Sequence, residues 1–268
     1  MNLGTQIATA RRAKKMTQVK LAEKLGVSTE AVSKWEQDKY LPSPEKLSKL
    51  HEVLNFSLYE EDGSIRNMRL FDEDHMSAFL KGKLNAGSFP EASKAMHFAK
   101  EKHAGSFRTP KEAKIPYINH PLTMVCHAFA MGLEDDKLLA ALFLHDVVED
   151  CDVTPAELPV SEEVQTVVAL VSKTKPYSEK EYYEGIAGNP MACLVKCIDR
   201  CNNLSSMSMG FTDKKIEKYV KETETYYPEL LRIVKGCPEY NNAAWLLNYQ
   251  IKSLLAMAKR IDRFSSST

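Results

Sequence analysis

Hydrophobic residues recur along most of this chain at the three- and four-residue spacing of amphipathic helices, whereas the strict alternation of a half-buried strand is scarce. The first sixty residues divide into four or five short helical stretches. From Phe89 to about Arg260 one helical stretch follows another. The pattern predicts an all-α fold, with a small helical bundle at the N-terminus followed by a larger helical domain.

Capping and turn residues mark the helices of the first sixty residues. Thr17 is placed to cap a helix over 18–25, Gly26 provides the tight turn that follows, and Ser28 is placed to cap a second helix that runs through Trp35. The apolar positions of these two helices fall on one face, which we expect to be buried: Leu21, Ala22, Leu25, Val27, Val32 and Trp35.

Polar side chains lie on the opposite face of the second helix, where they would point outward: Thr29, Glu30, Ser33 and Lys34. In a helix-turn-helix this face lies along base edges in the major groove, and Gln18 at the start of the preceding helix is placed for a phosphate contact. Residues 3–56 resemble the lambda-repressor-like helix-turn-helix family of the Xre type. The resemblance implies binding to double-stranded DNA by a homodimer that reads paired half-sites. The alternative is a small helical bundle that binds nothing.

The chain divides into three segments. We assign residues 1–60 to the helix-turn-helix domain, residues 61–88 to a linker that contains a helix, and residues 89–268 to the larger domain. Residues 1–60 hold ten Lys and Arg against seven Asp and Glu, and the remainder holds 26 against 29. An anionic partner therefore suits the first segment.

The composition narrows the class of protein further. A hydrophobic fraction of 44% and a charged fraction of 27% are typical of a globular protein with a packed core. The longest apolar run, Leu138 to Leu144, is far shorter than the roughly 20 residues that span a bilayer, and the N-terminus has no apolar signal core. Six Cys in 268 residues do not suggest a disulfide framework. These features predict a cytoplasmic protein without a membrane segment.

A cluster of ionisable residues follows the most apolar helix of the larger domain. His145, Asp146, Glu149 and Asp150 come directly after the apolar run and are expected to continue its helix. Burying charge is unfavourable unless the charge is paired or binds a metal, so a helix that served packing alone would not carry this cluster. The neighbouring His and Asp can converge on one divalent ion at the edge of the helix.

Two further metal ligands must come from other segments. His120 lies in the run Tyr-Ile-Asn-His-Pro, and Asp199 lies in the run Val-Lys-Cys-Ile-Asp-Arg-Cys-Asn-Asn-Leu. Both residues sit in helical stretches whose apolar neighbours would bury them. We therefore expect His120, His145, Asp146 and Asp199 to form a metal site.

The three motifs, in this order, resemble the HD superfamily of metal phosphohydrolases, whose pattern is His, then His-Asp, then Asp. Over about residues 88–209 the similarity is to the hydrolase domain of the RelA/SpoT alarmone family and to the small alarmone hydrolases, because most other HD enzymes lack the Glu-Asp pair of His-Asp-Val-Val-Glu-Asp. The resemblance implies one Mn²⁺ per chain, a metal that suits mixed His and Asp ligands. It also implies that Glu149 and Asp150 activate the attacking water. The implied reaction removes the 3′-pyrophosphate from guanosine tetra- or pentaphosphate.

The resemblance extends to nucleotide-binding positions. Arg108 matches the arginine that stacks on the base, Tyr117 matches the tyrosine of the first motif, and Asn203 matches the asparagine four residues after the last ligand. Lys196 and Arg200 lie on the helix of that last ligand and are expected to contact phosphate or to support the ligands. Ordinary solvated charge explains these two residues equally well.

Two other functions stay open. The loop after Arg108 is longer than the family's and has Thr109 in place of a lysine, so a different nucleotide could be the substrate. The second alternative is a nucleotide-sensing transcriptional regulator with little or no turnover. A sensor would not need Glu149 and Asp150, and their presence favours an enzyme.

Overall fold

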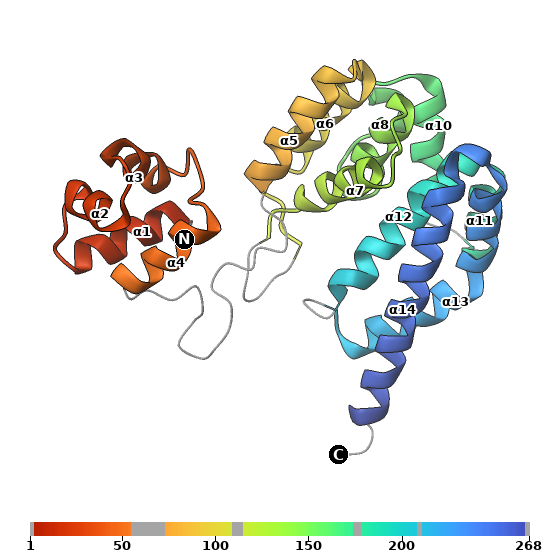
Figure 1. Cartoon of the computed structure of the whole chain (residues 1–268). Coiled ribbons are helices and arrows are strands. Elements are labelled where there is room, and N and C mark those ends of the chain that lie inside the picture. The colour runs from red at the N-terminus through yellow and green to blue at the C-terminus, as the bar shows by residue number, and fades with distance from the viewer. Residues whose placement is uncertain (1–2, 55–72, 109–114, 174–177, 208–210, 266–268) are drawn as a thin grey trace. The chain divides into compact units, whose positions relative to one another are not determined.

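The structure is a computed structural model that describes residues 3–54, 73–108, 115–173, 178–207 and 211–265, without the side chains at 44–45, 47–48, 51 and 261–265. Over the residues described, the elements are helices and short helical turns with no strand, which confirms the all-α prediction. The chain divides into two compact units, Met1–Leu70 and Phe71–Thr268. Figure 1 labels the helices of each unit.

Four short helices form the small unit: α1 (Leu3–Ala13), α2 (Gln18–Leu25), α3 (Thr29–Glu36) and α4 (Pro44–Leu54). Their apolar faces meet in one core, made of Ile7, Leu21, Ala22, Leu25, Val32, Trp35, Leu50 and Leu54. Five of the six residues predicted to face inward are in this core. The sixth, Val27, is half-buried and packs against it.

The turn between α2 and α3 forms as the sequence predicts. The hydroxyl of Thr17 accepts a hydrogen bond from the N–H of Lys20, and the hydroxyl of Ser28 accepts one from the N–H of Ala31, each at 3.1 Å. Gly26 follows α2 with a φ of 62°, a left-handed conformation that glycine adopts without steric penalty. These residues fix the angle at which α3 leaves α2.

Gly4 allows α1 to pass close to the end of α3. A Cβ atom at this position would lie 2.4 Å from the carbonyl oxygen of Trp35 and 2.7 Å from Oδ2 of Asp38. The N–H of Gly4 instead donates a hydrogen bond to Oδ1 of Asp38 at 2.8 Å. The missing side chain is therefore what lets α1 and α3 meet here.

The larger unit is built from ten helices among the residues described: α5 (Glu73–Ala86), α6 (Pro90–Lys102), α7 (Asn119–Ala130), α8 (Asp136–Leu144), α9 (Val147–Asp150), α10 (Glu162–Val171), α11 (Glu179–Ala187), α12 (Pro190–Ser206), α13 (Asp213–Gly236) and α14 (Asn241–Ser265). Helix α6 packs on α8, and α13 packs on α14. Nowhere in the described ranges is a helix long and apolar enough to cross a bilayer. Location in the cytoplasm stays a prediction.

Helix α12 is the central helix of the larger unit. It contacts α7, α8, α10, α11, α13 and α14. Every residue from Ala192 to Leu204 is consequently buried, the charged ones included. A helix enclosed on so many sides brings Lys196, Asp199 and Arg200 into the interior, where each must find a partner.

The helix predicted within the linker belongs to the larger unit. Helix α5 packs against α6 and α7, and its Leu80 and Leu84 are part of the core of that unit. The compact part of the larger unit therefore begins before residue 89, because α5 has an apolar side to bury. The rest of the predicted linker, up to residue 72, lies outside the described residues.

Candidate metal centre

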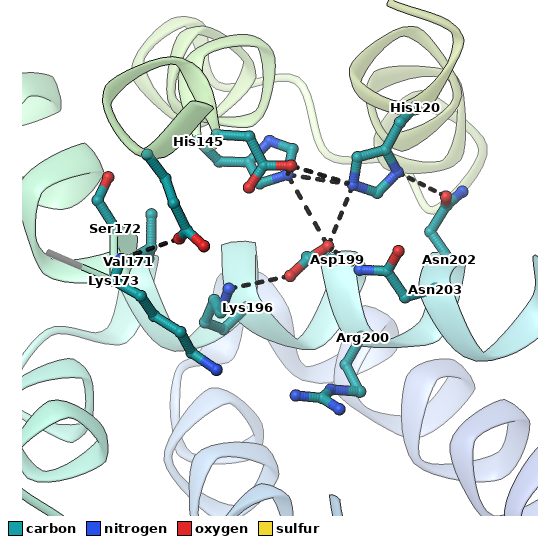
Figure 2. Close-up of polar contacts among 12 residues, drawn as sticks. His120, His145, Val171, Ser172, Lys173, Lys196, Asp199, Arg200, Asn202 and Asn203 are labelled. Carbon is teal, nitrogen blue, oxygen red and sulfur yellow. Dashed lines mark hydrogen bonds and ion pairs between the residues drawn. The ribbon is translucent and has the colours of Figure 1, made fainter. Parts of the chain in front are cut away.

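The four predicted ligands come from three separate places in the larger unit. His120 lies in the first turn of α7, His145 and Asp146 lie between α8 and α9, and Asp199 lies in the middle of α12. The side chains of His120, His145 and Asp199 point toward one another (Figure 2). The four residues thus meet in space although 79 positions separate His120 from Asp199.

The helix that carries His145 and Asp146 ends where the sequence predicted that it would continue. Helix α8 stops at Leu144, His145 is its C-cap, and Asp146 is the N-cap of the short helix α9. Neighbouring side chains on an unbroken helix point about 100° apart, which separates their tips. The break instead brings Oδ2 of Asp146 within 2.9 Å of Nε2 of His145.

The distances among the ligand atoms match those around one metal ion. Nε2 of His120 lies 3.2 Å from Nε2 of His145 and 3.1 Å from Oδ1 of Asp199, and Nε2 of His145 lies 3.8 Å from the same oxygen. Ligands about 2.1 Å from an octahedral ion are about 3 Å apart when adjacent. The ligand atoms of these three residues all fall within 4.8 Å of one another. Oδ2 of Asp146 lies 3.6 Å from Nε2 of His120, but Asp146 is outside this group of three mutually close residues and stays a predicted fourth ligand.

Hydrogen bonds to the outer nitrogens set the tautomers of both histidines. Nδ1 of His145 donates to the carbonyl oxygen of Leu142 at 2.9 Å, and Nδ1 of His120 donates to Oδ1 of Asn202 at 2.7 Å. Each neutral ring then directs the lone pair of Nε2 toward the other ligands. Two lone pairs and two carboxylates repel one another unless a cation lies among them, so this donor set fits a divalent metal.

The pKa values of the two histidines shift in opposite directions. Burial, helped by the positive charge of Arg108, lowers the pKa of His120. Burial also acts to lower the pKa of His145, but the adjacent Asp146 outweighs it and raises that pKa. A proton therefore competes with a metal ion mainly at His145.

Asp199 is held from two sides along its own helix. Nζ of Lys196 donates to Oδ2 at 3.0 Å, and Nδ2 of Asn203 donates to Oδ1 at 2.5 Å. Burial disfavours the carboxylate, but Lys196 and the nearby histidines hold its pKa well below the ordinary value. Lys196 is itself buried, so the structure places it as a partner of the ligand.

Tyr117 also supports a ligand. Its hydroxyl donates to Oδ2 of Asp146 at 2.6 Å, and its ring stacks on His103 with the ring centres 4.6 Å apart. Burial and the negative charge of Asp146 raise the pKa of Tyr117 far above its ordinary value, which keeps the hydroxyl a donor. The tyrosine thus fixes the carboxylate that the break between α8 and α9 brings into the site.

The predicted catalytic pair lies on α9, the short helix that begins directly after Asp146. Oε2 of Glu149 accepts a hydrogen bond from the N–H of Lys173 at 2.9 Å. Burial of its carboxyl group raises the pKa of Glu149 above the ordinary glutamate value, although the residue as a whole is exposed. A carboxylate with a raised pKa is a better proton acceptor. Asp150 is exposed, and its charge contributes to the raised pKa of Tyr117.

The remaining predicted nucleotide contacts fall into two groups. Arg108 lies at the rim, where its guanidinium donates to the side-chain oxygens of Asn202 and Asn203. Arg200 points away from the ligands (Figure 2) and pairs with Glu222 of α13 at 3.2 Å. Its guanidinium carbon also lies 4.1 Å from the ring centre of Tyr219. Arg200 is therefore enclosed by protein partners.

Asn202 is a site residue that the sequence analysis missed. It holds Nδ1 of His120, and it is positioned by α12, the helix of Asp199. A metal-binding histidine nearly always donates its second ring N–H to an oxygen, and this rule gives a reason to search the ligand-bearing helices for such an acceptor. Asn202 provides this acceptor for His120.

The predicted DNA contacts lie on α2 and α3 of the small unit. Thr29 and Glu30 are exposed, and Glu30 pairs with Lys34 at 2.8 Å. The Ser33 hydroxyl accepts from the side chain of Gln37 at 3.0 Å. Gln18 donates to Oε2 of Glu36 at 2.8 Å, and Glu36 is also bound by the guanidinium of Arg11.

Comparison with known proteins confirms the class indicated by the fold and the donor set, a helical metal-dependent hydrolase joined to a helix-turn-helix. Residues 7–60 match the family model described as helix-turn-helix. The chain is 33% identical over 137 residues to guanosine-3′,5′-bis(diphosphate) 3′-pyrophosphohydrolase MESH1 of Xenopus tropicalis, covering 47% of this chain and 76% of that relative. Against MESH1 of Homo sapiens it is 33% identical over 150 residues, covering 53% and 82%. The chain belongs to the family of guanosine-3′,5′-bis(diphosphate) 3′-pyrophosphohydrolases.

Some relatives are much longer proteins that this chain matches over only part of their length. The pyrophosphohydrolase of the same name from Aquifex aeolicus is 35% identical over 150 residues, which is 52% of this chain and 21% of that relative. A solved structure titled "A metazoan ortholog of SpoT hydrolyzes ppGpp and plays a role in starvation responses" matches with a TM-score of 0.50 and 20% identity, covering 63% of this chain and 95% of that chain. That likeness shows a shared helical fold.

Proposed function

We propose that the larger unit hydrolyses the 3′-pyrophosphate of guanosine tetra- or pentaphosphate, with one Mn²⁺ bound by His120, His145, Asp146 and Asp199. The observation that carries the proposal is the convergence of the His120 and His145 nitrogens and the Asp199 carboxylate within metal-binding distance, with Asp146 beside His145. The names of the relatives supply the substrate. Mn²⁺ suits this set because it accepts both imidazole and carboxylate ligands.

The residues of the chain divide the work of hydrolysis. When bound, the metal polarises a phosphoryl oxygen and lowers the pKa of water. We assign Glu149 to accept the proton of the attacking water, with Asp150 as the other member of the pair. The water oxygen bonds to the phosphorus next to the 3′ oxygen as the bond between that phosphorus and the 3′ oxygen breaks. The 3′ oxygen takes up a proton, which Glu149 or solvent returns, and the products are guanosine 5′-di- or triphosphate with a free 3′-hydroxyl, and pyrophosphate.

We also propose which residues contact the nucleotide. We assign Arg108 and Asn203 to the base and the ribose, and Arg108 would then exchange its asparagine partners for the base. The present partners of Tyr117, Lys196 and Arg200 favour positioning of the site over direct binding of substrate. The segment that raises the question of guanine specificity, 109–114, lies outside the described residues.

A panel of nucleotides tests the proposal. Mn²⁺-loaded protein is incubated with guanosine tetraphosphate, its adenosine counterpart, GTP and GDP, and products are separated by chromatography. We expect the guanosine tetraphosphate to turn over, and we expect Glu149→Gln to lower kcat by roughly 10²–10⁴-fold, the usual contribution of a general base. If wild-type protein acted no faster than Glu149→Gln on every nucleotide, the proposal would be wrong.

We propose in addition that the small unit binds double-stranded DNA as a homodimer, through Gln18, Thr29, Glu30, Ser33 and Lys34. The helix-turn-helix match and the exposed polar face of α3 support this. Gln18 donates only one of its two amide hydrogens to Glu36, so the second can reach a phosphate.

The DNA proposal is tested with duplexes selected from random sequence. Binding should weaken as salt rises, because released counterions drive phosphate contacts. Substituting Thr29 and Ser33 by Ala should relax the preference for the selected duplex, and sedimentation should show two chains per duplex. Equal affinity for selected and random DNA in the wild type would contradict base recognition.

A further inference from the structure

One buried carboxylate on α13 gathers donors from three other segments of the larger unit. Oε1 of Glu222 accepts hydrogen bonds from Nζ of Lys173 at 2.9 Å and from the hydroxyl of Tyr183 at 2.5 Å, and it pairs with Arg200 at 3.2 Å. The side chain of Glu222 is only 4% exposed. A buried charge with three donors is held in one place, since moving it would break several charge-assisted bonds together.

Lys173 connects this carboxylate to the rim of the metal centre. It follows the end of α10, and while its ammonium binds Glu222, its backbone N–H donates to Oε2 of Glu149 at 2.9 Å. The same short segment is tied at Val171, whose carbonyl accepts from the Tyr182 hydroxyl at 2.5 Å. The position of the Lys173 N–H therefore depends on the bond between Lys173 and Glu222 and on the bond between Val171 and Tyr182.

Among the residues described, the hydrogen bond to the Glu149 carboxyl is the one from Lys173. Glu149 lies on α9, a helix of four residues, and it is exposed. The charges that act on its carboxyl are those of Lys196 from α12 and of Asp146 and Asp150 from its own segment. The N–H of Lys173 donates a hydrogen bond to this carboxyl at 2.9 Å.

We propose that Glu222 is a positioning residue for hydrolysis: by binding the side chain of Lys173, it holds the Lys173 N–H where that group aims the Glu149 carboxylate at the attacking water. The proposal rests on the proposed function, because it assigns a purpose to the direction of Glu149. It differs from a role for Lys173 in binding substrate phosphate, since its ammonium is occupied by Glu222. It also differs from a role for Glu222 limited to neutralising Arg200.

Steady-state kinetics on the full-length Mn²⁺-loaded protein separates these roles. Lys173→Met removes the ammonium but keeps the backbone N–H, and Glu222→Gln weakens the anchor from the other end. We expect both to lower kcat by about 10- to 100-fold with KM changed less than about twofold, because a misplaced base slows chemistry without weakening binding. Lys173→Arg, which keeps a donor for Glu222, should restore most of kcat.

A matched control removes a different bond to the same carboxylate. Tyr183→Phe deletes the hydroxyl that donates to Glu222 but leaves Lys173 in contact with it, so we expect kcat close to wild type. If Lys173→Met instead raised KM with kcat unchanged, the ammonium would contact substrate and the proposal would be wrong. Wild-type kcat in Lys173→Met would overturn it as well, and this variant avoids the loss of folding that Glu222→Gln could cause.

A second readout does not depend on turnover. In protein labelled with ¹⁵N at lysine alone, the NMR resonance of the Lys173 amide is identified by its absence from the spectrum of Lys173→Met. It should shift as Glu149 titrates and should stop responding in Glu149→Gln. In Glu222→Gln we expect the response to shrink, because the N–H no longer stays against the carboxylate. An undiminished response in Glu222→Gln overturns the positioning role. Absence of turnover by the wild type, with the NMR response as expected, would instead overturn the proposed reaction.

Discussion

The buried carboxylate of Glu222 should make the stability of the larger unit depend on pH in a way that one substitution removes. Burial disfavours the charged form, but Arg200 and Lys173 outweigh it and lower the pKa of Glu222 from 4.5 to about 2. A carboxyl whose pKa is lowered by folding stabilises the protein above its unfolded pKa, and that stabilisation is lost as the pH falls through the folded pKa. The window therefore runs from about pH 4.5 down to about pH 2.

The magnitude follows from the shift. A lowering of about 2.5 pKa units corresponds to about 3 kcal/mol at about 1.4 kcal/mol per unit, and little correction for solvent is needed because the side chain is 4% exposed. Glu222→Gln cannot ionise and lacks this dependence. The free energy of unfolding of the wild type minus that of Glu222→Gln should thus shrink by about 3 kcal/mol between pH 5 and pH 2.

Urea unfolding followed by circular dichroism across this pH range measures the difference. Taking the difference between two proteins cancels the titration of the other carboxyls, which both share. The control is Glu224→Gln, two residues further along α13, where the side chain is 45% exposed and pairs with Lys259 at the surface. Its difference from wild type should stay within about 0.5 kcal/mol at every pH. A difference for Glu222→Gln that is the same at pH 5 and pH 2 would refute the reasoning.

Three further predictions concern other contacts. Gly4→Ala should destabilise the small unit by about 1–3 kcal/mol, because the added Cβ meets the backbone oxygen of Trp35. The control, Gly82→Ala, should be neutral or stabilising, because its Cβ meets nothing within 4 Å. Equal effects of the two substitutions in thermal melts would contradict the close approach at Gly4. Tyr117→Phe should weaken Mn²⁺ binding by about 10- to 100-fold in a calorimetric titration, since Asp146 loses its donor; unchanged affinity would show that the hydroxyl does not position the ligand. Asn202→Leu should weaken metal binding similarly by freeing Nδ1 of His120, and it should leave the melting of the small unit as it was.

The sequence was enough to predict the helical class and to single out four candidate ligands, because both depend on local patterns. Periodicity of apolar residues reports helices directly, and charged residues beside Leu138–Leu144 stand out since burial makes them unfavourable without partners. His120 and Asp199 could be added because their motifs occur in a fixed order. Their convergence, however, depends on α12 lying against both α7 and α8, a long-range contact that no spacing encodes.

Other features could not be predicted because they depend on the partners a side chain finds after folding. An unbroken helix was expected through Asp150, but α8 ends at Leu144, and the break aims Asp146 at His145. Arg200 was expected near phosphate or the ligands, and it faces Glu222 because α13 covers that side of α12. The helix expected in the linker packs in the larger unit, where its Leu80 and Leu84 are part of the core.

The most direct test of the central claim is the fate of the water oxygen during hydrolysis. Mn²⁺-loaded protein would convert guanosine tetraphosphate in water enriched in ¹⁸O, with products followed by ³¹P NMR. We expect one pyrophosphate for each GDP, with the label in pyrophosphate, because water attacks phosphorus and the bond to the 3′ oxygen breaks. We expect no reaction for Asp199→Ala. Label in the nucleoside hydroxyl, release of orthophosphate in place of pyrophosphate, or full activity of Asp199→Ala would contradict the proposed hydrolysis.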